Sequence, residues 1–188
     1  MAEAPLTVEV EKRLELSFVS SVIGIVSCAL IVSTFVFPWY ESNYFRNSAF
    51  DFSEEYSLTS FTRDGERFSY PAGDSELASV GDTMGLVFWI MIVALAISIV
   101  ALAMSSLERR VSGVVAGALS AAMLMIVTTV FYFGMIDDLR LDGFNQMTHW
   151  NKTMALDTGP ELSYFIVVAL PAVQAAQAIF LAYSGSEE

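Results

Sequence analysis

Residues 83–107 read TMGLVFWIMIVALAISIVALAMSSL and carry no charged side chain. A helix needs roughly 20 predominantly apolar residues to cross the ~30 Å hydrocarbon core of a bilayer, so this run is long enough to span one. Three further runs are also uncharged, and 55% of the 188 residues are hydrophobic, which is more than an ordinary soluble domain contains. We therefore predict an all-α membrane protein, a bundle of four transmembrane helices at residues 16–38, 83–105, 111–134 and 161–183.

Basic residues near the ends of these spans predict the orientation. Lys12 and Arg13 precede the first span, and Arg109 and Arg110 lie in the short connection between the second and third. Cytosolic loops carry an excess of Lys and Arg, so we expect both termini to be cytosolic, most simply at the cell membrane. The segments expected inside are 1–15, 106–110 and 184–188, and those expected outside are the loops 39–82 and 135–160.

The two predicted outer loops are acidic. Residues 41–82 hold nine acids against three arginines, residues 137–161 hold five acids against two basic residues, and the formal net charge of the chain is −12. Such a surface repels nucleic acid and attracts cations or basic partners. The alternative is that the acids only form a solvated coat.

The first outer loop contains a hairpin signal, FTRDGERFSYP at residues 61–71. Asp64-Gly65 favours a two-residue type I′ turn, because both central positions of that turn need a positive φ. We predict a hairpin over residues 57–70, with an ion pair at the turn, an aromatic pair behind it, and a third strand at 49–52 that ends before Glu54-Glu55. The residues expected opposite one another are Arg63 and Glu66, Phe61 and Phe68, and Thr59 and Tyr70.

A lone hairpin is marginally stable in water, so its aromatic side needs a surface to pack on. Cys28 is the only cysteine and lies in the first span, so no intrachain disulfide is available to hold the loop. We expect the ribbon to pack on aromatic residues at the outer end of the helices, namely Trp39, Tyr40, Tyr44, Phe45, Phe131, Tyr132, Phe133 and Trp150. The candidate interaction surface is Trp39, Tyr40, Phe61, Phe68, Tyr70 and Trp150.

Small residues recur at four-residue steps in the spans, at Gly24 in the first and at Gly113 and Gly117 in the third. Such stripes let helix backbones approach closely in lipid, where no hydrophobic drive holds helices together. We expect them to pack the bundle, and the alternative is that they form a homo-oligomer contact.

The fourth span contains Pro171, followed by Gln174 and Gln177. Amides in the membrane are costly unless they form hydrogen bonds, so both glutamines should face the bundle, where serines of the first two spans are available. They are expected to join helices. Alternatively, they form a polar site for a solute.

The sequence offers little for catalysis or pumping. Residues 16–38, 83–105, 111–134 and 162–183 contain no Asp, Glu, Lys, Arg or His. The spans therefore lack the usual proton relay or gating charge of pumps and channels. No nucleophile elbow, phosphate loop or zinc motif occurs, and the acids Asp137, Asp138 and Asp142 near His149 lack the ligand pattern of a calcium loop. We expect no enzyme activity, cofactor or metal.

The order of parts resembles the claudin and peripheral-myelin-protein superfamily. The shared features are four spans, a long first outer loop with strands, a tight basic turn at Glu108-Arg109-Arg110 and a shorter second outer loop. Phe37-Pro38-Trp39-Tyr40 is similar to an aromatic mouth, whereas the Gly-Leu-Trp and paired-cysteine signature is absent. The resemblance covers nearly the whole chain at the level of topology. It implies a helical bundle with an extracytosolic sheet and carries over no functional residue.

The function expected from these features is that of a non-catalytic membrane scaffold or accessory subunit, acting through an acidic, aromatic outer cap. Its expected partners are membrane lipids and either another protein or a second copy, not nucleic acid. The alternative is a small permease or channel subunit with a polar site at Gln174 and Gln177.

Overall fold

Four long helices form the body of the protein in the computed structural model, which describes residues 4–46, 49–73, 76–107, 110–137 and 154–184. Each helix packs against two others, in the cyclic order α1, α2, α3, α5. All four are long and apolar enough to cross a membrane, so the chain is an integral multi-pass membrane protein. The helices are α1 (Ala4–Ser33), α2 (Glu76–Ser106), α3 (Arg110–Phe131) and α5 (Leu162–Tyr183), and α3 continues into a π-helical turn, η1 (Tyr132–Asp137).

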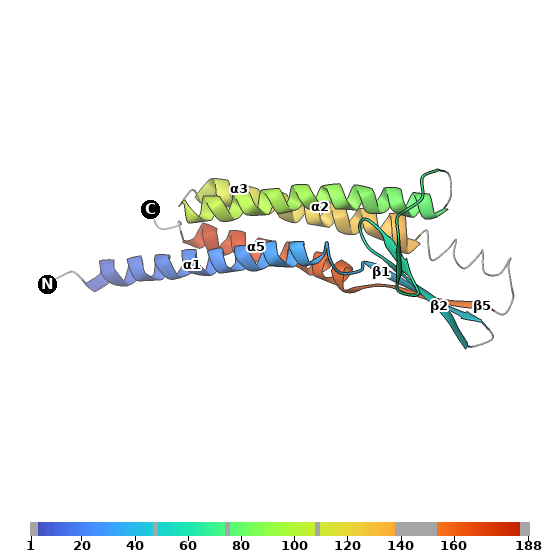
Figure 1. Ribbon diagram of the computed structural model, residues 1–188. Helices are drawn as coiled ribbons and strands as arrows, with labels where there is room; N and C mark the ends of the chain where they lie inside the picture. The colour runs from blue at the N-terminus through green and yellow to red at the C-terminus, as the bar shows by residue number, and fades with distance from the viewer. Residues whose placement is uncertain (1–3, 47–48, 74–75, 108–109, 138–153, 185–188) are drawn as a thin grey trace.

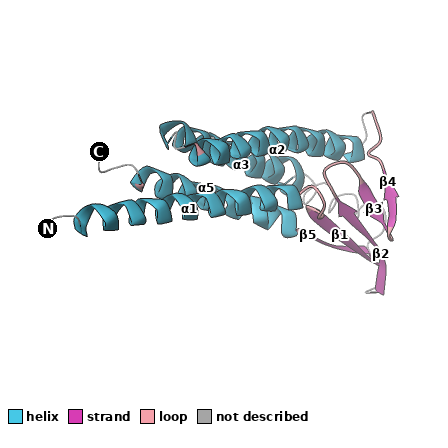
Figure 2. Ribbon diagram, turned by 60° about the vertical axis from the view of Figure 1, so that its left-hand side comes forward, coloured by secondary structure: helices cyan, strands magenta, loops and turns pink. Residues whose placement is uncertain are grey.

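A five-stranded antiparallel sheet lies at one end of the bundle, and α1 begins and α5 ends at the other (Figures 1 and 2). Its strand order is β4-β3-β2-β1-β5. Four strands come from the connection between α1 and α2, and the fifth directly precedes α5. The strands are β1 (Tyr40–Arg46), β2 (Ala49–Tyr56), β3 (Phe61–Arg63), β4 (Glu66–Phe68) and β5 (Met154–Pro160).

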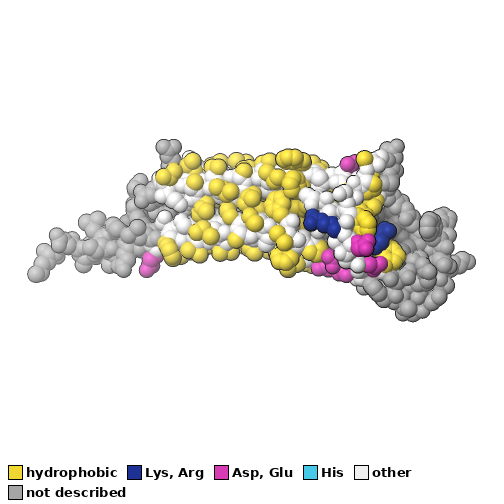
Figure 3. Space-filling view, viewed as in Figure 1, with side chains coloured by type: hydrophobic (Ala, Val, Ile, Leu, Met, Phe, Trp, Pro, Cys, Tyr) yellow, Lys and Arg dark blue, Asp and Glu magenta, His cyan; other side chains and the backbone are white. Residues whose placement is uncertain are grey.

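The surface of the molecule divides in the same way. Hydrophobic side chains cover the side of the bundle, whereas the Arg, Asp and Glu side chains in view gather mainly at the sheet end (Figure 3). The predicted fold class is therefore confirmed: a four-helix membrane bundle carries a sheet in its loops. α2 begins at Glu76, before the span expected from residue 83, because a helix can extend beyond the hydrocarbon.

The hairpin prediction is confirmed at its centre. Asp64 and Gly65 have φ values of 51° and 82°, as a type I′ turn requires, and Phe61 pairs with Phe68 and Arg63 with Glu66. The ladder is shorter than expected, since β3 begins at Phe61 and β4 ends at Phe68, leaving Thr59 and Tyr70 outside it.

The predicted strand break at Glu54-Glu55 is wrong, because β2 continues through both residues to Tyr56. Glu54 has partners on the neighbouring strands, so its carboxylate does not need water. β1 and β5 were not predicted, and each of their residues pairs with the other strand from Tyr40↔Pro160 to Arg46↔Met154.

Trp39 joins the sheet to the helices. Its side chain is 0% exposed, and its ring centroid lies 5.2 Å from that of Phe131 on α3. The indole Nε1–H donates to the carbonyl of Thr34 (2.8 Å) and the backbone N–H donates to Tyr56 in β2 (2.8 Å). Its carbonyl accepts from the N–H of Glu161, just before α5 (2.9 Å). One residue thus connects the turn after α1, β2, α3 and the residue before α5.

The three predicted small-residue contacts all lie inside the bundle. A Cβ placed on Gly24 would lie 2.5 Å from Nε2 of Gln177, and one on Gly113 would lie 2.5 Å from Cδ2 of Leu181. Gly117 is less tight: its Cβ would lie 3.6 Å from that of Ala178. The stripes of α1 and α3 therefore face α5 of the same chain.

Candidate functional site

The inner face of the sheet carries an aromatic row across four strands. Alternation in each strand sets Tyr40, Tyr56, Phe61 and Phe68 on one face, and the register pairs them in that order. The distances between successive ring centroids are 6.2, 6.2 and 5.4 Å. Tyr40, Tyr56 and Phe61 belong to the same buried core as Val80 and Met84 of α2, so this row attaches the sheet to the bundle.

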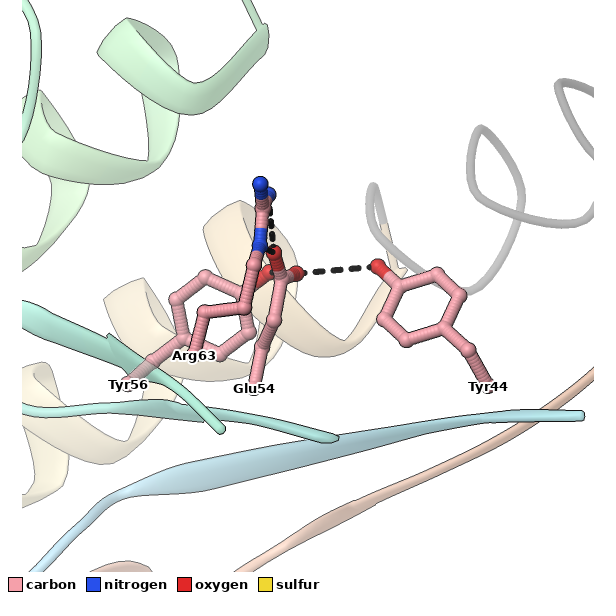
Figure 4. Close-up of polar contacts among 4 residues, drawn as sticks. All are labelled: Tyr44, Glu54, Tyr56 and Arg63. Atoms are coloured by element: carbon pink, nitrogen blue, oxygen red, sulfur yellow. Dashed lines mark hydrogen bonds and ion pairs between the residues drawn. The ribbon is translucent and has the colours of Figure 1, made fainter. Parts of the chain in front are cut away.

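A buried carboxylate lies beside the aromatic row. Glu54 of β2 accepts hydrogen bonds from the hydroxyls of Tyr56 (2.6 Å) and Tyr44 (3.0 Å), both at Oε2 (Figure 4). Its Oε1 accepts from Nε of Arg63 (2.7 Å), which also contributes a second guanidinium N–H to the same oxygen. We call these four residues, Tyr44, Glu54, Tyr56 and Arg63, the carboxylate cluster.

The carboxylate cluster corrects the predicted ion pair, because Arg63 pairs with Glu54 and not with Glu66 across the turn. The Glu54 side chain is 4% exposed and that of Arg63 is 51% exposed. A buried carboxylate is tolerated only with a charge partner and hydrogen bonds, and Glu54 has both. Arg63 also lies over the ring of Phe52, with its Cζ 5.5 Å from the ring centroid, which adds a cation–π contact.

The environment keeps the donors of the carboxylate cluster protonated. Burial, followed by the negative charge of Glu54, raises the pKa of the Tyr44 hydroxyl. Burial also raises the pKa of Tyr56, with Tyr44 and Glu54 adding to the effect. Hydrogen bonding to Glu54 raises the pKa of Arg63. All three groups therefore remain donors to Glu54 at neutral pH.

The opposite face of the sheet points away from the core. Arg67, Thr62, Glu55 and Glu41 follow one another across β4, β3, β2 and β1. Glu55 and Arg67 are exposed, Thr62 and Glu41 are half-buried, and Arg67 Nε donates to Ser60 Oγ (2.8 Å). We call these four residues the outer row. It is a polar strip on a sheet whose other face packs on the bundle.

Glu161 lies beside the outer row. Burial, then a hydrogen bond and repulsion from Glu41, raise the pKa of the Glu161 carboxyl. The Glu161 carboxyl therefore keeps its proton to a higher pH than an ordinary glutamate does. Among the described residues no group of three or more His, Cys, Asp or Glu side chains could hold a metal ion.

The structure assigns different places to the residues of the predicted interaction surface. Trp39, Tyr40 and Phe61 are buried, so they position the sheet and do not meet a partner. Phe68 is 41% exposed at the edge of the sheet. Tyr70 is half-buried, donates its hydroxyl to the carbonyl of Ser57 (2.7 Å) and packs 5.8 Å from Phe61. Trp150 and His149 lie outside the described residues. Of the expected packing partners, Tyr132 and Phe133 are exposed.

Gln174 and Gln177 are buried in the bundle, as their positions in the sequence predict. Gln174 Nε2 donates to Ser98 Oγ of α2 (2.8 Å), and Ser98 lies 2.6 Å from Ser120 of α3. Ser20 of α1 donates to the backbone carbonyl of Gln177 (3.3 Å). These contacts form a neutral polar seam that joins all four helices.

Sequence reasoning missed the carboxylate cluster and the outer row. The signal is present in β2, where Phe52, Glu54 and Tyr56 alternate with Ser53 and Glu55. That pattern sets the three on one side of a strand. The adjacent acids Glu54 and Glu55 resemble a polar break between strands, and this hides the alternation.

Comparison with protein-family models gives no match, and comparison with curated proteins gives none either. The arrangement of four long apolar helices with an antiparallel sheet in the loops agrees with the topology that the claudin-like resemblance implies. No family is assigned on this basis, since topology alone does not establish descent or function.

Proposed function

We propose that the protein is a non-catalytic membrane scaffold or accessory subunit that binds a partner through the outer row of its sheet. The observation that carries this proposal is that the sheet is fixed from its inner face. The aromatic row and Trp39 hold it against the bundle without a disulfide, and the carboxylate cluster joins β1, β2 and β3 to one another. The outer row therefore keeps one geometry, and a preorganised surface loses less entropy on binding.

The charges of the outer row suggest the chemistry of the partner. Glu41 and Glu55 lie directly opposite each other, and Arg67 lies at the other end of the row. A complementary surface would carry basic residues against the two glutamates and an acid against Arg67, which sets the register of binding. Such rim charges act mainly on specificity and association rate.

The test uses crosslinking in the native membrane. A photoreactive residue at Thr62 should give one stoichiometric adduct, whereas the same residue at Ser106, at the far end of α2, should not. Glu55→Lys should abolish the adduct because it reverses a charge in the outer row. The matched control is Glu15→Lys, the same change at the opposite end of the bundle, which should leave the adduct intact. Equal effects of the two substitutions, or no adduct from Thr62, would refute the proposal.

The sidedness of the sheet is part of this proposal. We propose that both termini are cytosolic and that the outer row faces outside, on the basis of Lys12, Arg13, Arg109 and Arg110. With Cys28 replaced by alanine, single cysteines at Thr59 and Ser106 should react differently with an impermeant thiol reagent applied to intact cells. Labelling of Ser106→Cys but not of Thr59→Cys would show that the orientation is opposite to the one proposed.

The alternative function, a small permease or channel subunit with a polar site at Gln174 and Gln177, has weaker support. Fully buried apolar side chains pack on the sheet side of Gln174, among them Leu170, Phe131 and Trp39. A double substitution of both glutamines by leucine separates the two functions. Partner crosslinking from Thr62 should survive it, whereas solute movement through the polar seam should not.

A further inference from the structure

Two buried polar atoms in the bundle have no hydrogen-bond partner among the described residues: Oγ of Ser27 on α1 and Oε1 of Gln174 on α5. Ser27 is fully buried, and Gln174 is 1% exposed. Buried polar atoms in proteins are paired in the large majority of cases, and the cost of leaving one unpaired is greatest where no water is near. Two unpaired polar atoms inside a membrane bundle therefore indicate that a further hydrogen-bonding group is bound there.

The positions of Ser27 and Gln174 on adjacent antiparallel helices place the two residues at the same level of the bundle. Gly24 faces the side chain of Gln177, since a Cβ on Gly24 would lie 2.5 Å from Gln177 Nε2. The helices α1 and α5 are antiparallel, because α1 begins and α5 ends at the same end of the bundle (Figure 1). Three residues forward from Gly24 is Ser27, and three residues back from Gln177 is Gln174. Both steps rise ~4.5 Å in the same direction, so Ser27 and Gln174 remain level.

Ser98 meets only one end of the Gln174 amide. Gln174 Nε2 donates to Ser98 Oγ (2.8 Å), and the Ser98 hydroxyl also lies within hydrogen-bond distance of the carbonyl of Ala94 (2.9 Å) and of Ser120 Oγ (2.6 Å). A hydroxyl both donates and accepts, so Ser98 can pair with either end of the amide. The end turned away from Ser98, Oε1, has no partner among the described residues and does not reach Ser27 Oγ directly, which is also without one.

We propose that one water molecule binds between α1 and α5, donating to Gln174 Oε1 and sharing a hydrogen bond with Ser27 Oγ. Water both donates and accepts, which matches an acceptor-only oxygen opposite a hydroxyl. A cation would also suit two oxygen atoms, but residues 16–38, 83–107, 111–136 and 162–183 contain no acid to balance its charge. Burying an unbalanced ion is far more costly than burying a neutral donor.

This site goes beyond the proposed function, because it assigns a ligand to the interior of the bundle and not to the sheet. Its test depends on the sign of a stability change. If the water is bound, the Ser27 hydroxyl forms a stabilising hydrogen bond with it. Ser27→Ala removes that hydrogen bond and should lower the melting temperature in detergent by about 2 to 4 °C. If Ser27 Oγ is simply unpaired, the same substitution removes a buried, unsatisfied hydroxyl and should leave the melting temperature unchanged or raise it.

Two comparisons complete the test. Ser21→Ala is the matched control, because the Ser21 hydroxyl donates to the carbonyl of Ser17 in its own helix (3.0 Å), and it should change the melting temperature little. In a Gln174→Met background, the effect of Ser27→Ala should disappear, since the water has lost its acceptor. Additive effects would overturn the proposal.

A crystal structure that resolves ordered waters gives a readout that does not depend on the stability of the variants. A density peak within about 3 Å of both Ser27 Oγ and Gln174 Oε1 is expected. A well-ordered interface with no peak there would overturn the proposal.

Discussion

The bundle and the sheet both bury polar side chains, but they use different chemistry to do so. In the bundle the buried polar groups are neutral, and hydrogen bonds join Gln174 to Ser98 and Ser98 to Ser120 across α5, α2 and α3. In the sheet the central group is a carboxylate, Glu54, which is paired with Arg63 and with two tyrosine hydroxyls.

The difference follows from what lies outside each region. The bundle is surrounded by lipid, where a charge has no source of solvation, so only small neutral groups are tolerated. The sheet lies at the end of the bundle, and half of the Arg63 side chain remains exposed there. One partner of the ion pair thus stays hydrated while the other is buried. A protein without a disulfide can therefore hold its loop with a charge, provided that the charge lies beyond the membrane.

The largest expected effect tests whether the sheet is held by its aromatic row. Phe61→Ala should cost about 3 to 5 kcal/mol, because Phe61 is 6% exposed and packs in the core. Limited proteolysis should then cut at Arg63 and Arg67, while helical circular dichroism stays unchanged. Phe68→Ala, at the exposed edge, should have a much smaller effect. If Phe61→Ala and Phe68→Ala destabilise the sheet equally, burial of the aromatic row is not what holds the sheet in place.

The next substitution breaks the charge pair of the sheet. Arg63→Met should cost about 3 kcal/mol, because it leaves the Glu54 carboxylate buried without a cation. Faster hydrogen exchange of the β2 and β3 amides is the measurement. Arg67→Met is the matched control on the adjacent strand, since Arg67 contacts Ser60 and no buried acid. If Arg67→Met opens the sheet as much, the carboxylate cluster is not what stabilises it.

A substitution in the bundle should produce the reverse pattern. Gly117→Leu should cost about 1 to 3 kcal/mol, because the side chain would meet Ala178 and the carbonyl of Gln174. The detergent melting temperature should fall while the sheet keeps its protease resistance. Gly85→Leu is the control, since a Cβ on Gly85 meets nothing within 4 Å. A change in oligomer size alone would assign the stripe to association between copies.

The smallest effect concerns pH. Because the pKa of Glu161 is raised above its ordinary value of 4.5 in the folded state, the folded protein retains a proton that the unfolded chain has lost. The contribution of this carboxyl to stability is fully present below the unfolded-state pKa of 4.5 and is lost as the pH rises through the raised pKa of the folded state. Glu161→Gln should therefore raise the melting temperature slightly at pH 7 and have no such effect at pH 4. An equal change in melting temperature at pH 4 and pH 7 would contradict this prediction.

The sequence predicts the bundle well because lipid imposes a simple rule. Uncharged runs mark the spans, and the cost of unpaired amides correctly directs Gln174 and Gln177 inward. The hairpin is also predictable, because Asp64-Gly65 determines the turn and the turn determines the register of Phe61 with Phe68. These signals are local, so they can be read from one stretch of chain.

The remaining sheet could not be predicted because its signals are not local. β5 contains Asp157, Gly159 and Pro160, which are poor strand formers, and it is ordered by pairing with β1 from a different loop. The partner of Arg63 depends on strand order, because Glu54 becomes its neighbour only when β2 lies beside β3. Sequence alone favoured Glu66, which is nearer along the chain.

Trp39 couples the sheet to the bundle. It is hydrogen-bonded to Thr34 directly after α1, to Tyr56 in β2 and to Glu161 directly before α5, and it packs on α3. The position of the sheet is therefore tied through one residue to the segments where α1 ends and α5 begins and to the ring of Phe131 on α3.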